Sequence, residues 1–248
     1  MFRLFAGFLV MLFTSSGTSA AEIKVLSAGA VEPGLEAFAH QVKRELGHDL
    51  RIQFNTAPQI AKRLAAGEVY DILISPPAAI TQAAQDGKVA ADSRVPVGRV
   101  GAGIHVRTGA SVPQIATVDE LKQALLNADS VVYNTASTGI YLDNLFKKMG
   151  ILGQIKPKTT RYANGSSVME HVIKGKGREI GFGAITEIRS FEPKGLKFAG
   201  PLPAEVQNYT SYDAVLMTGA TSADAAKAVL RYLAAPAAKA LFAAHGIE

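Results

Sequence analysis

Residues 22–86 read EIKVLSAGAVEPGLEAFAHQVKRELGHDLRIQFNTAPQIAKRLAAGEVYDILISPPAAITQAAQD and repeat one unit three times. Each unit is a short apolar strand followed by a helix with apolar residues at helical spacing. The expected strands are 23–27, 50–54 and 70–74, and the expected helices are 32–46, 58–66 and 78–86. Strands that alternate with helices predict a parallel sheet covered by helices on both faces. Ligands of such sheets bind beyond the carboxyl ends of the strands.

The rest of the chain predicts a second α/β unit. The glycine-rich run 95–106 is extended and is expected to cross between two lobes. Strands follow at 130–133, 159–162 and 179–183, with helices at 118–127, 139–149 and 168–174. The extended run 207–217 is expected to cross back, and an alanine-rich helical tail, 222–244, is broken at Pro236.

The N-terminal segment predicts export. Arg3 precedes an apolar run from Leu4 to Phe13, and small residues follow up to Ala21. This order is typical of a secretory signal peptide over residues 1–21, cleaved after Ala20 or Ala21, and the apolar run is short for a membrane span. An uncleaved anchor is the alternative.

Composition excludes several classes of function. The chain has no cysteine, which excludes disulfides, zinc–thiolate sites and a lipoprotein anchor. Its net charge of +5 comes from scattered residues rather than from the concentrated basic face of a nucleic-acid binder. His105, His171 and His245 share no metal-ligand spacing, so we expect no metal, and no cofactor motif is present.

Four predicted loops share one design: each follows a strand, carries small or hydroxyl residues and opens a helix. A helix start exposes free backbone N–H groups and the positive end of the helix dipole. Several such starts at one place predict an anion site that needs no charged side chain. The loops are Ser27-Ala28-Gly29-Ala30, Asn55-Thr56-Ala57-Pro58, Ala136-Ser137-Thr138-Gly139 and Asn164-Gly165-Ser166-Ser167.

Eleven residues form the predicted ligand site, and no catalytic residue is assigned. They are Gly29, Ala30, Thr56, Ala57, Ser75, Ser137, Thr138, Gly139, Tyr141, Ser166 and Ser167. Tyr141 lies one turn into its helix, so it either faces the cleft or packs. Asp213 and Glu187 are the acids nearest the expected cleft, and each is expected to be a salt-bridge partner rather than a catalytic base.

Several runs resemble the molybdate-binding branch of the periplasmic substrate-binding proteins. They are KVLSAGAVEPGLEAF (24–38), FNTAPQIAKRLAAGEVYDILISPP (54–77), TGIY (138–141), EIGFG (179–183) and LRYLAAPAAKALFAAHGIE (230–248). The resemblance implies the type 2 binding-protein fold, with two α/β lobes, each a mostly parallel sheet flanked by helices, joined by two crossing strands. Lobe 1 would comprise 22–100 and 208–248, and lobe 2 would comprise 101–207.

The resemblance implies a periplasmic, monomeric receptor that holds a small oxyanion or carboxylate between its lobes, for an ABC-type importer in the inner membrane. The two serine hydroxyls that hold molybdate in that branch fall at Ala30 and Ala57, and its tyrosine falls near Ala184. These departures favour a larger anion, such as an organic acid, held mainly by backbone amides.

A second branch is similar to this chain as well: the exported aconitate isomerases, which move a proton across an unsaturated tricarboxylic acid. That chemistry needs a positioned base and donors for the carboxylates. The enzyme alternative therefore stays open beside the receptor, and so does a sensor or orphan binding protein without a transporter.

Overall fold

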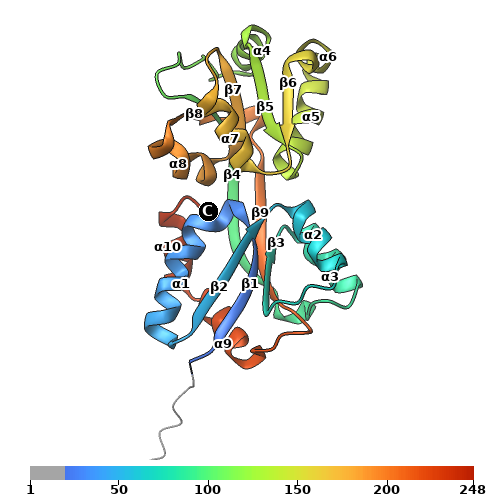
Figure 1. Cartoon of the computed structure of the whole chain (residues 1–248), viewed down its shortest axis with the longest axis vertical. Coiled ribbons are helices and arrows are strands. Elements are labelled where there is room, and N and C mark those ends of the chain that lie inside the picture. The colour runs from blue at the N-terminus through green and yellow to red at the C-terminus, as the bar shows by residue number, and fades with distance from the viewer. Residues whose placement is uncertain (1–19) are drawn as a thin grey trace, which may run out of the picture.

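The computed structural model describes residues 20–248, so the predicted signal peptide lies outside the described residues except for Ala20 and Ala21. The described chain forms two groups of strands and helices connected by β4 and β9 (Figure 1). None of the helices formed by residues 20–248 has the length and apolar character needed to cross a bilayer.

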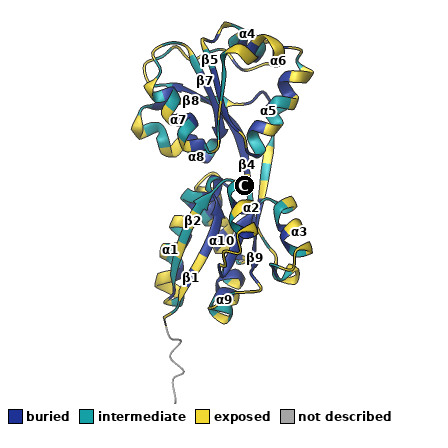
Figure 2. Cartoon of the chain, turned by 45° about the vertical axis from the view of Figure 1, so that its right-hand side comes forward, coloured by how far each residue is buried: buried dark blue, intermediate teal, exposed yellow. Residues whose placement is uncertain are grey.

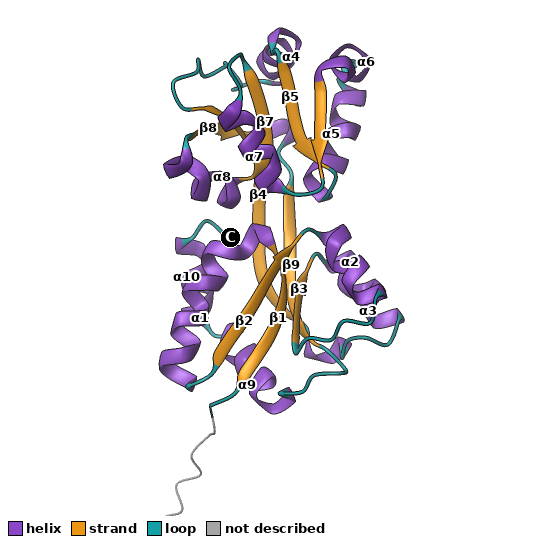
Figure 3. Ribbon diagram, in the orientation of Figure 1, coloured by secondary structure: helices purple, strands orange, loops and turns teal. Residues whose placement is uncertain are grey.

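The lower half contains the first three strands and both ends of the described chain. Its strands are β1 (Glu22–Ala28), β2 (Asp49–Asn55), β3 (Ile72–Ser75) and β9 (Tyr209–Leu216). Its helices are α1 (Glu32–Leu46), α2 (Ala57–Ala65), α3 (Pro77–Gln85), α9 (Ala223–Leu233) and α10 (Pro236–Ala244), with short 3₁₀ turns η1 (Gly29–Val31) and η2 (Ala91–Ser93). Helices α1 and α10 lie on one side of the sheet, and α2 and α3 lie on the other (Figure 3).

The upper half repeats this arrangement. Its strands are β5 (Ser130–Asn134), β6 (Thr159–Tyr162), β7 (Glu179–Ala184) and β8 (Leu196–Pro201). Its helices are α4 (Val118–Asn127), α5 (Ser137–Lys148), α6 (Leu152–Ile155), α7 (Gly165–Lys174) and α8 (Ile185–Phe191), with 3₁₀ turns η3 (Lys156–Lys158), η4 (Glu192–Lys194) and η5 (Ala204–Val206).

Strand β4 (Val95–Arg107) joins the two halves. Its first part, up to Gly101, pairs antiparallel with β9, and the part from Ala102 onward pairs with β7 and β8. Strand β1 lies parallel between β2 and β3, and β5 lies parallel between β6 and β7. The predicted α/β class with parallel strands in each half and crossing strands is confirmed, whereas the predicted lobe boundaries stay a prediction.

Each half has its own hydrophobic core, seen as buried sheets beneath partly exposed helices (Figure 2). Phe38 of α1 is 1% exposed and packs on Phe242 of α10, with ring centroids 5.7 Å apart. Burying such a side chain stabilises a fold by about 2–3 kcal/mol. Helix α10 therefore contributes to the same hydrophobic core as α1.

Several elements differ from the predictions. Helices α5 and α7 begin at Ser137 and Gly165, two and three residues before their expected starts. Helix α8 is not predicted, because the glycine-rich β7 runs directly into it without a loop of turn residues, and helix α6 and strand β8 are not predicted either.

Candidate functional site

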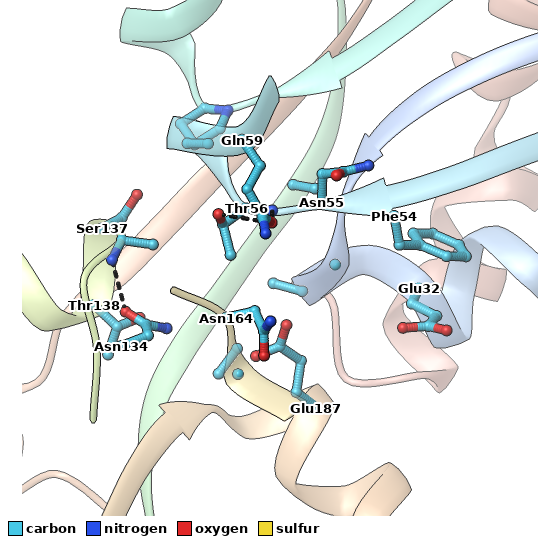
Figure 4. A pocket seen from close by; sticks show the side chains of 18 of the residues that line it. Glu32, Phe54, Asn55, Thr56, Gln59, Asn134, Ser137, Thr138, Asn164 and Glu187 are labelled. Carbon is cyan, nitrogen blue, oxygen red and sulfur yellow. Dashed lines mark hydrogen bonds between the residues drawn. The ribbon is translucent and has the colours of Figure 1, made fainter. Parts of the chain in front are cut away.

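The carboxyl ends of the parallel strands of the two halves face each other across a cavity of about 240 Å³ (Figure 4). This volume is below the roughly 300–1,000 Å³ of sites that hold drug-sized ligands, so the cavity suits a small solute. Its lining comes from both halves: Ala28, Gly29, Ala30, Glu32, Phe54, Asn55, Thr56, Ala57, Gln59, Pro76, Asn134, Ala136, Ser137, Thr138, Asn164, Gly165, Ser166, Ala184, Glu187 and Tyr212.

Most of the predicted site residues line this cavity, and all four predicted loops contribute to it. The predicted residues in the lining are Gly29, Ala30, Thr56, Ala57, Ser137, Thr138 and Ser166. Their role as ligand contacts stays a prediction, but their convergence from four separate segments is a property of the fold.

Four predicted residues lie outside the lining. Ser75 is fully buried at the end of β3, and Tyr141 donates its hydroxyl to the carbonyl of Val206 at 2.7 Å, so it packs rather than facing the cavity. Ser167 uses its backbone N–H to donate to Asn164. Gly139 is buried in the first turn of α5, and a Cβ atom there would overlap the carbonyl oxygen of Asn134.

Two asparagines that the sequence analysis did not assign to the site hold the upper loops. The Oδ1 of Asn134 accepts from the N–H groups of Ala136 at 3.0 Å and Gly139 at 3.2 Å, and the Oδ1 of Asn164 accepts from Ser167 at 2.8 Å. An asparagine in a short loop before a helix is a capping signal that could have identified Asn164, whereas Asn134 ends β5 and lies two residues before Ala136, the N-cap of α5.

A glutamine caps the start of a helix in the lower half. The N–H of Thr56 donates to Oε1 of Gln59 at 2.9 Å, and the Thr56 hydroxyl donates to the same oxygen at 3.0 Å. This pairing fixes the start of α2 at the cavity wall. Thr56 followed three residues later by Gln59 is a capping-box spacing, which is visible in the sequence.

The caps leave other amides free. Within residues 20–248, no group accepts a hydrogen bond from the backbone N–H of Ser137, Thr138, Gly165 or Ser166. These N–H groups lie in the first turns of α5 and α7, where the helix dipole adds positive potential. The upper wall can therefore bind an anion without a cationic side chain.

The cavity lining has no lysine, arginine or histidine but contains two acids, Glu32 and Glu187. Burial and, to a smaller extent, the nearby Glu32 raise the pKa of Glu187 to about 7, and a backbone hydrogen bond with Ala184 opposes them. Burial also raises the pKa of Glu32, with Glu36 adding to the effect and Lys194 opposing it. The Tyr212 hydroxyl has its pKa raised by burial and by the charge of Glu187.

The two acids singled out in the sequence have different surroundings. Asp213 accepts a hydrogen bond from Nε of Arg94 at 2.5 Å, which confirms its expected salt bridge. Asp213 is not among the residues that line the cavity. The same expectation is wrong for Glu187, which has no ion-pair partner in the described part of the chain. Helix α8 places Glu187 in the lining of the cavity, into which its side chain points (Figure 4).

The histidines do not form a metal site. His105 is fully buried in β4, His171 pairs with the Tyr162 hydroxyl at 2.9 Å, and His245 contacts the carbonyl of Leu241. Across residues 20–248, no three His, Asp or Glu side chains come together in a way that could hold a metal ion.

Comparison with known proteins identifies the family. The sequence profile of the family described as bacterial extracellular solute-binding protein matches residues 23–248. The chain belongs to this family. The predicted resemblance to periplasmic substrate-binding proteins is thereby confirmed, and a solute-binding role is supported.

Two relatives of this solute-binding protein carry names that differ in function. An aconitate isomerase of Pseudomonas sp is 31% identical over 226 residues, which cover 88% of this chain and 85% of that protein. The molybdate-binding protein ModA of Escherichia coli (strain K12) is 25% identical and is matched over 98% of this chain and 96% of its own length.

Solved structures share the fold of this solute-binding protein. The periplasmic molybdate-binding protein of Azotobacter vinelandii superposes with a TM-score of 0.74 at 16% identity, covering 91% of this chain and 98% of that one. At this identity the likeness concerns the fold alone.

Proposed function

We propose that the protein captures a small carboxylate or other oxyanion in the cavity between its two halves, and that an organic acid is its natural ligand. The observation that carries this proposal is the set of free N–H groups at the starts of α5 and α7, on a cavity wall without cationic side chains. Anions bind such helix starts through hydrogen bonds and the helix dipole.

The residues at the lower wall favour an organic acid over molybdate. Ala30 and Ala57 have no hydroxyl where the molybdate binders that the chain resembles have serines, and Ala184 stands near their tyrosine. The apolar side chain of Phe54 also lines the cavity. A carbon skeleton contacts such groups favourably, whereas a compact tetrahedral oxyanion needs donors on all sides.

Transport is the cellular role that fits this binding. We propose that residues 1–21 direct the chain to the periplasm, and that an ABC-type permease of the inner membrane receives the solute. The lobes, 22–100 with 208–248 and 101–207, would close on the ligand by hinge motion at β4 and at the segment before β9. The buried hydrogen bond from the Thr186 hydroxyl to the Ala30 carbonyl, 2.6 Å long, joins the halves at one side of the cavity.

A thermal-shift assay on the mature protein tests the binding proposal. The panel contains molybdate, tungstate, sulfate, phosphate, citrate, cis-aconitate and trans-aconitate. A ligand at a hundred times its Kd stabilises by about 2.7 kcal/mol, which raises the Tm of a chain of this size by about 5–10 °C. We expect the tricarboxylates to give the largest shift, and a panel without any shift would contradict the proposal.

Isomerisation of an unsaturated tricarboxylic acid is a second candidate function. The observation that favours it is Glu187, a buried carboxyl in the cavity with a pKa of about 7, which suits a general base at neutral pH. Its carboxylate would take a proton from the methylene group next to the double bond. The C–H electron pair would become the new double bond, and the old one would take a proton at its far carbon.

Incubating cis-aconitate with the mature protein in D₂O tests this candidate. An active enzyme produces the trans isomer and incorporates deuterium at carbon, and Glu187→Gln abolishes both. Saturable binding of aconitate without conversion or deuterium incorporation would leave the receptor function alone.

A further inference from the structure

Glu187 occupies the place where the two halves of the molecule come together. It lies in the first turn of α8 and is partly buried, and its side chain points into the cavity close to Asn164 (Figure 4). Its neighbour Thr186 makes the buried hydrogen bond to Ala30 of the lower half. The carboxyl is therefore placed to contact anything held between the halves.

Two glycines, one from each half, leave the space that this carboxyl fills. A Cβ atom on Gly29 of η1 would lie 2.9 Å from Oε1 of Glu187, and one on Gly165 of α7 would lie 2.5 Å from Oε2. Both distances are shorter than van der Waals contact, so any other residue at either position would push the carboxyl away. The backbone on both sides is thus shaped around Glu187.

The described groups around the carboxyl include no cation, and only a backbone hydrogen bond with Ala184 favours its ionised form. Glu32 of α1 is the acid beside it, and Tyr212 of β9 is a buried neutral phenol. Lys194 of η4 lowers the pKa of Glu32. The pKa of Glu187 is raised mainly by burial.

The charged side chains of the adjoining helices have partners elsewhere. Arg189 of α8 pairs with Glu192 at 3.0 Å, and Lys174 of α7 pairs with Glu170 at 3.2 Å. A bound anion would therefore meet a carboxyl group that no cation neutralises, and an ionised Glu187 would repel it.

We propose that Glu187 binds the captured anion as a neutral carboxylic acid, donating its O–H to a ligand oxygen, so that capture takes up a proton. This inference rests on the proposed anion-binding function and adds a determinant of specificity to it. The free amides of α5 and α7 and the Glu187 hydroxyl are all donors, so together they select a ligand with unprotonated oxygens, such as a fully ionised carboxylate. Binding then weakens as the pH rises, because the proton must be supplied from solution.

Calorimetric titration of the mature protein tests this inference, with trans-aconitate and sulfate as the probes. Sulfate stays fully ionised from pH 6 to 9, so a pH dependence of its binding belongs to the protein; trans-aconitate is compared with it above pH 7, where its three carboxyl groups are ionised. With a pKa of about 7 in the free protein, the Kd is expected to rise about 90-fold from pH 6 to pH 9. Repeating the titration at pH 8 in buffers of different ionisation enthalpy should reveal an uptake of close to one proton.

Two variants separate Glu187 from other sources of pH dependence. Glu187→Gln keeps a donor of the same shape but cannot ionise, so its Kd is expected to stay constant from pH 6 to 9 with no proton uptake. Glu170→Gln removes an exposed acid of α7 outside the cavity and should behave as the native protein does.

The outcomes are distinct. A native Kd independent of pH, or a pH dependence that persists in Glu187→Gln, would overturn the role of Glu187 and leave anion binding intact. A native protein that binds neither probe, nor any anion of the thermal-shift panel, at any pH would overturn the proposed function and this inference with it.

Discussion

Replacing Glu187 with glutamine should make the ligand-free protein more stable at neutral and alkaline pH. Folding raises the pKa of this buried carboxyl from 4.5 to about 7. Between these values the folded chain holds a proton that the unfolded chain releases, so the free energy of unfolding falls as the pH rises through this window. One pKa unit corresponds to about 1.4 kcal/mol, so the loss amounts to about 3 kcal/mol by pH 8.

Glutamine has the shape of the protonated acid and removes this loss. We expect Glu187→Gln to match the native protein near pH 4.5 and to exceed it by about 3 kcal/mol at pH 8, which corresponds to a Tm difference of about 6–12 °C. Urea unfolding followed by circular dichroism from pH 4.5 to 8.5 measures the difference. Native and variant curves that run parallel over this range would refute the reasoning, and Glu170→Gln provides the control.

Three further predictions concern other positions. Thr138→Glu places a carboxylate at the start of α5, and we expect it to weaken anion binding at least a hundredfold by calorimetry while the circular dichroism spectrum stays native. Gly165→Ala should displace the Glu187 carboxyl, and it should lower ligand affinity at pH 6 without removing the fold; unchanged affinity would show that the carboxyl does not contact the ligand. Burial lowers the pKa of His105 from 6.5 to about 3. Below pH 6.5 the unfolded chain binds a proton that the folded chain does not, so the free energy of unfolding should fall by about 1.4 kcal/mol for each pH unit. His105→Phe should remove this slope in urea titrations at pH 4–7, whereas His245→Gln on the surface should keep it.

The sequence was sufficient for the general architecture because the fold repeats one local pattern. The spacing of Leu35, Phe38 and Val42 predicts the buried face of α1, and all three side chains are buried. The start of α7 is predicted too late because Asn164, its cap, lies four residues ahead of the first buried apolar side chain of the helix, Val168.

The chemistry of the site was predicted only in part. The loops of small residues are recognisable in the sequence because anion-binding helix starts need such residues. The environment of Glu187 is not, because its burial depends on Gly29 and Gly165, which are separated by more than a hundred residues along the chain and meet only in the folded molecule. An isolated glutamate in a helix is far more often exposed, so a salt bridge was the natural expectation.

The arrangement of the lower core has a consequence for how the protein is made. Phe242 and Ile247, among the last residues of the chain, contact the backbone at Gly34 in the first helix, and β9 completes the sheet that β1 begins. Contacts this distant in sequence form late, because a long loop must close before they can stabilise anything. The lower core can therefore close only once α10 has reached α1, so folding of this half waits for a segment far along the chain.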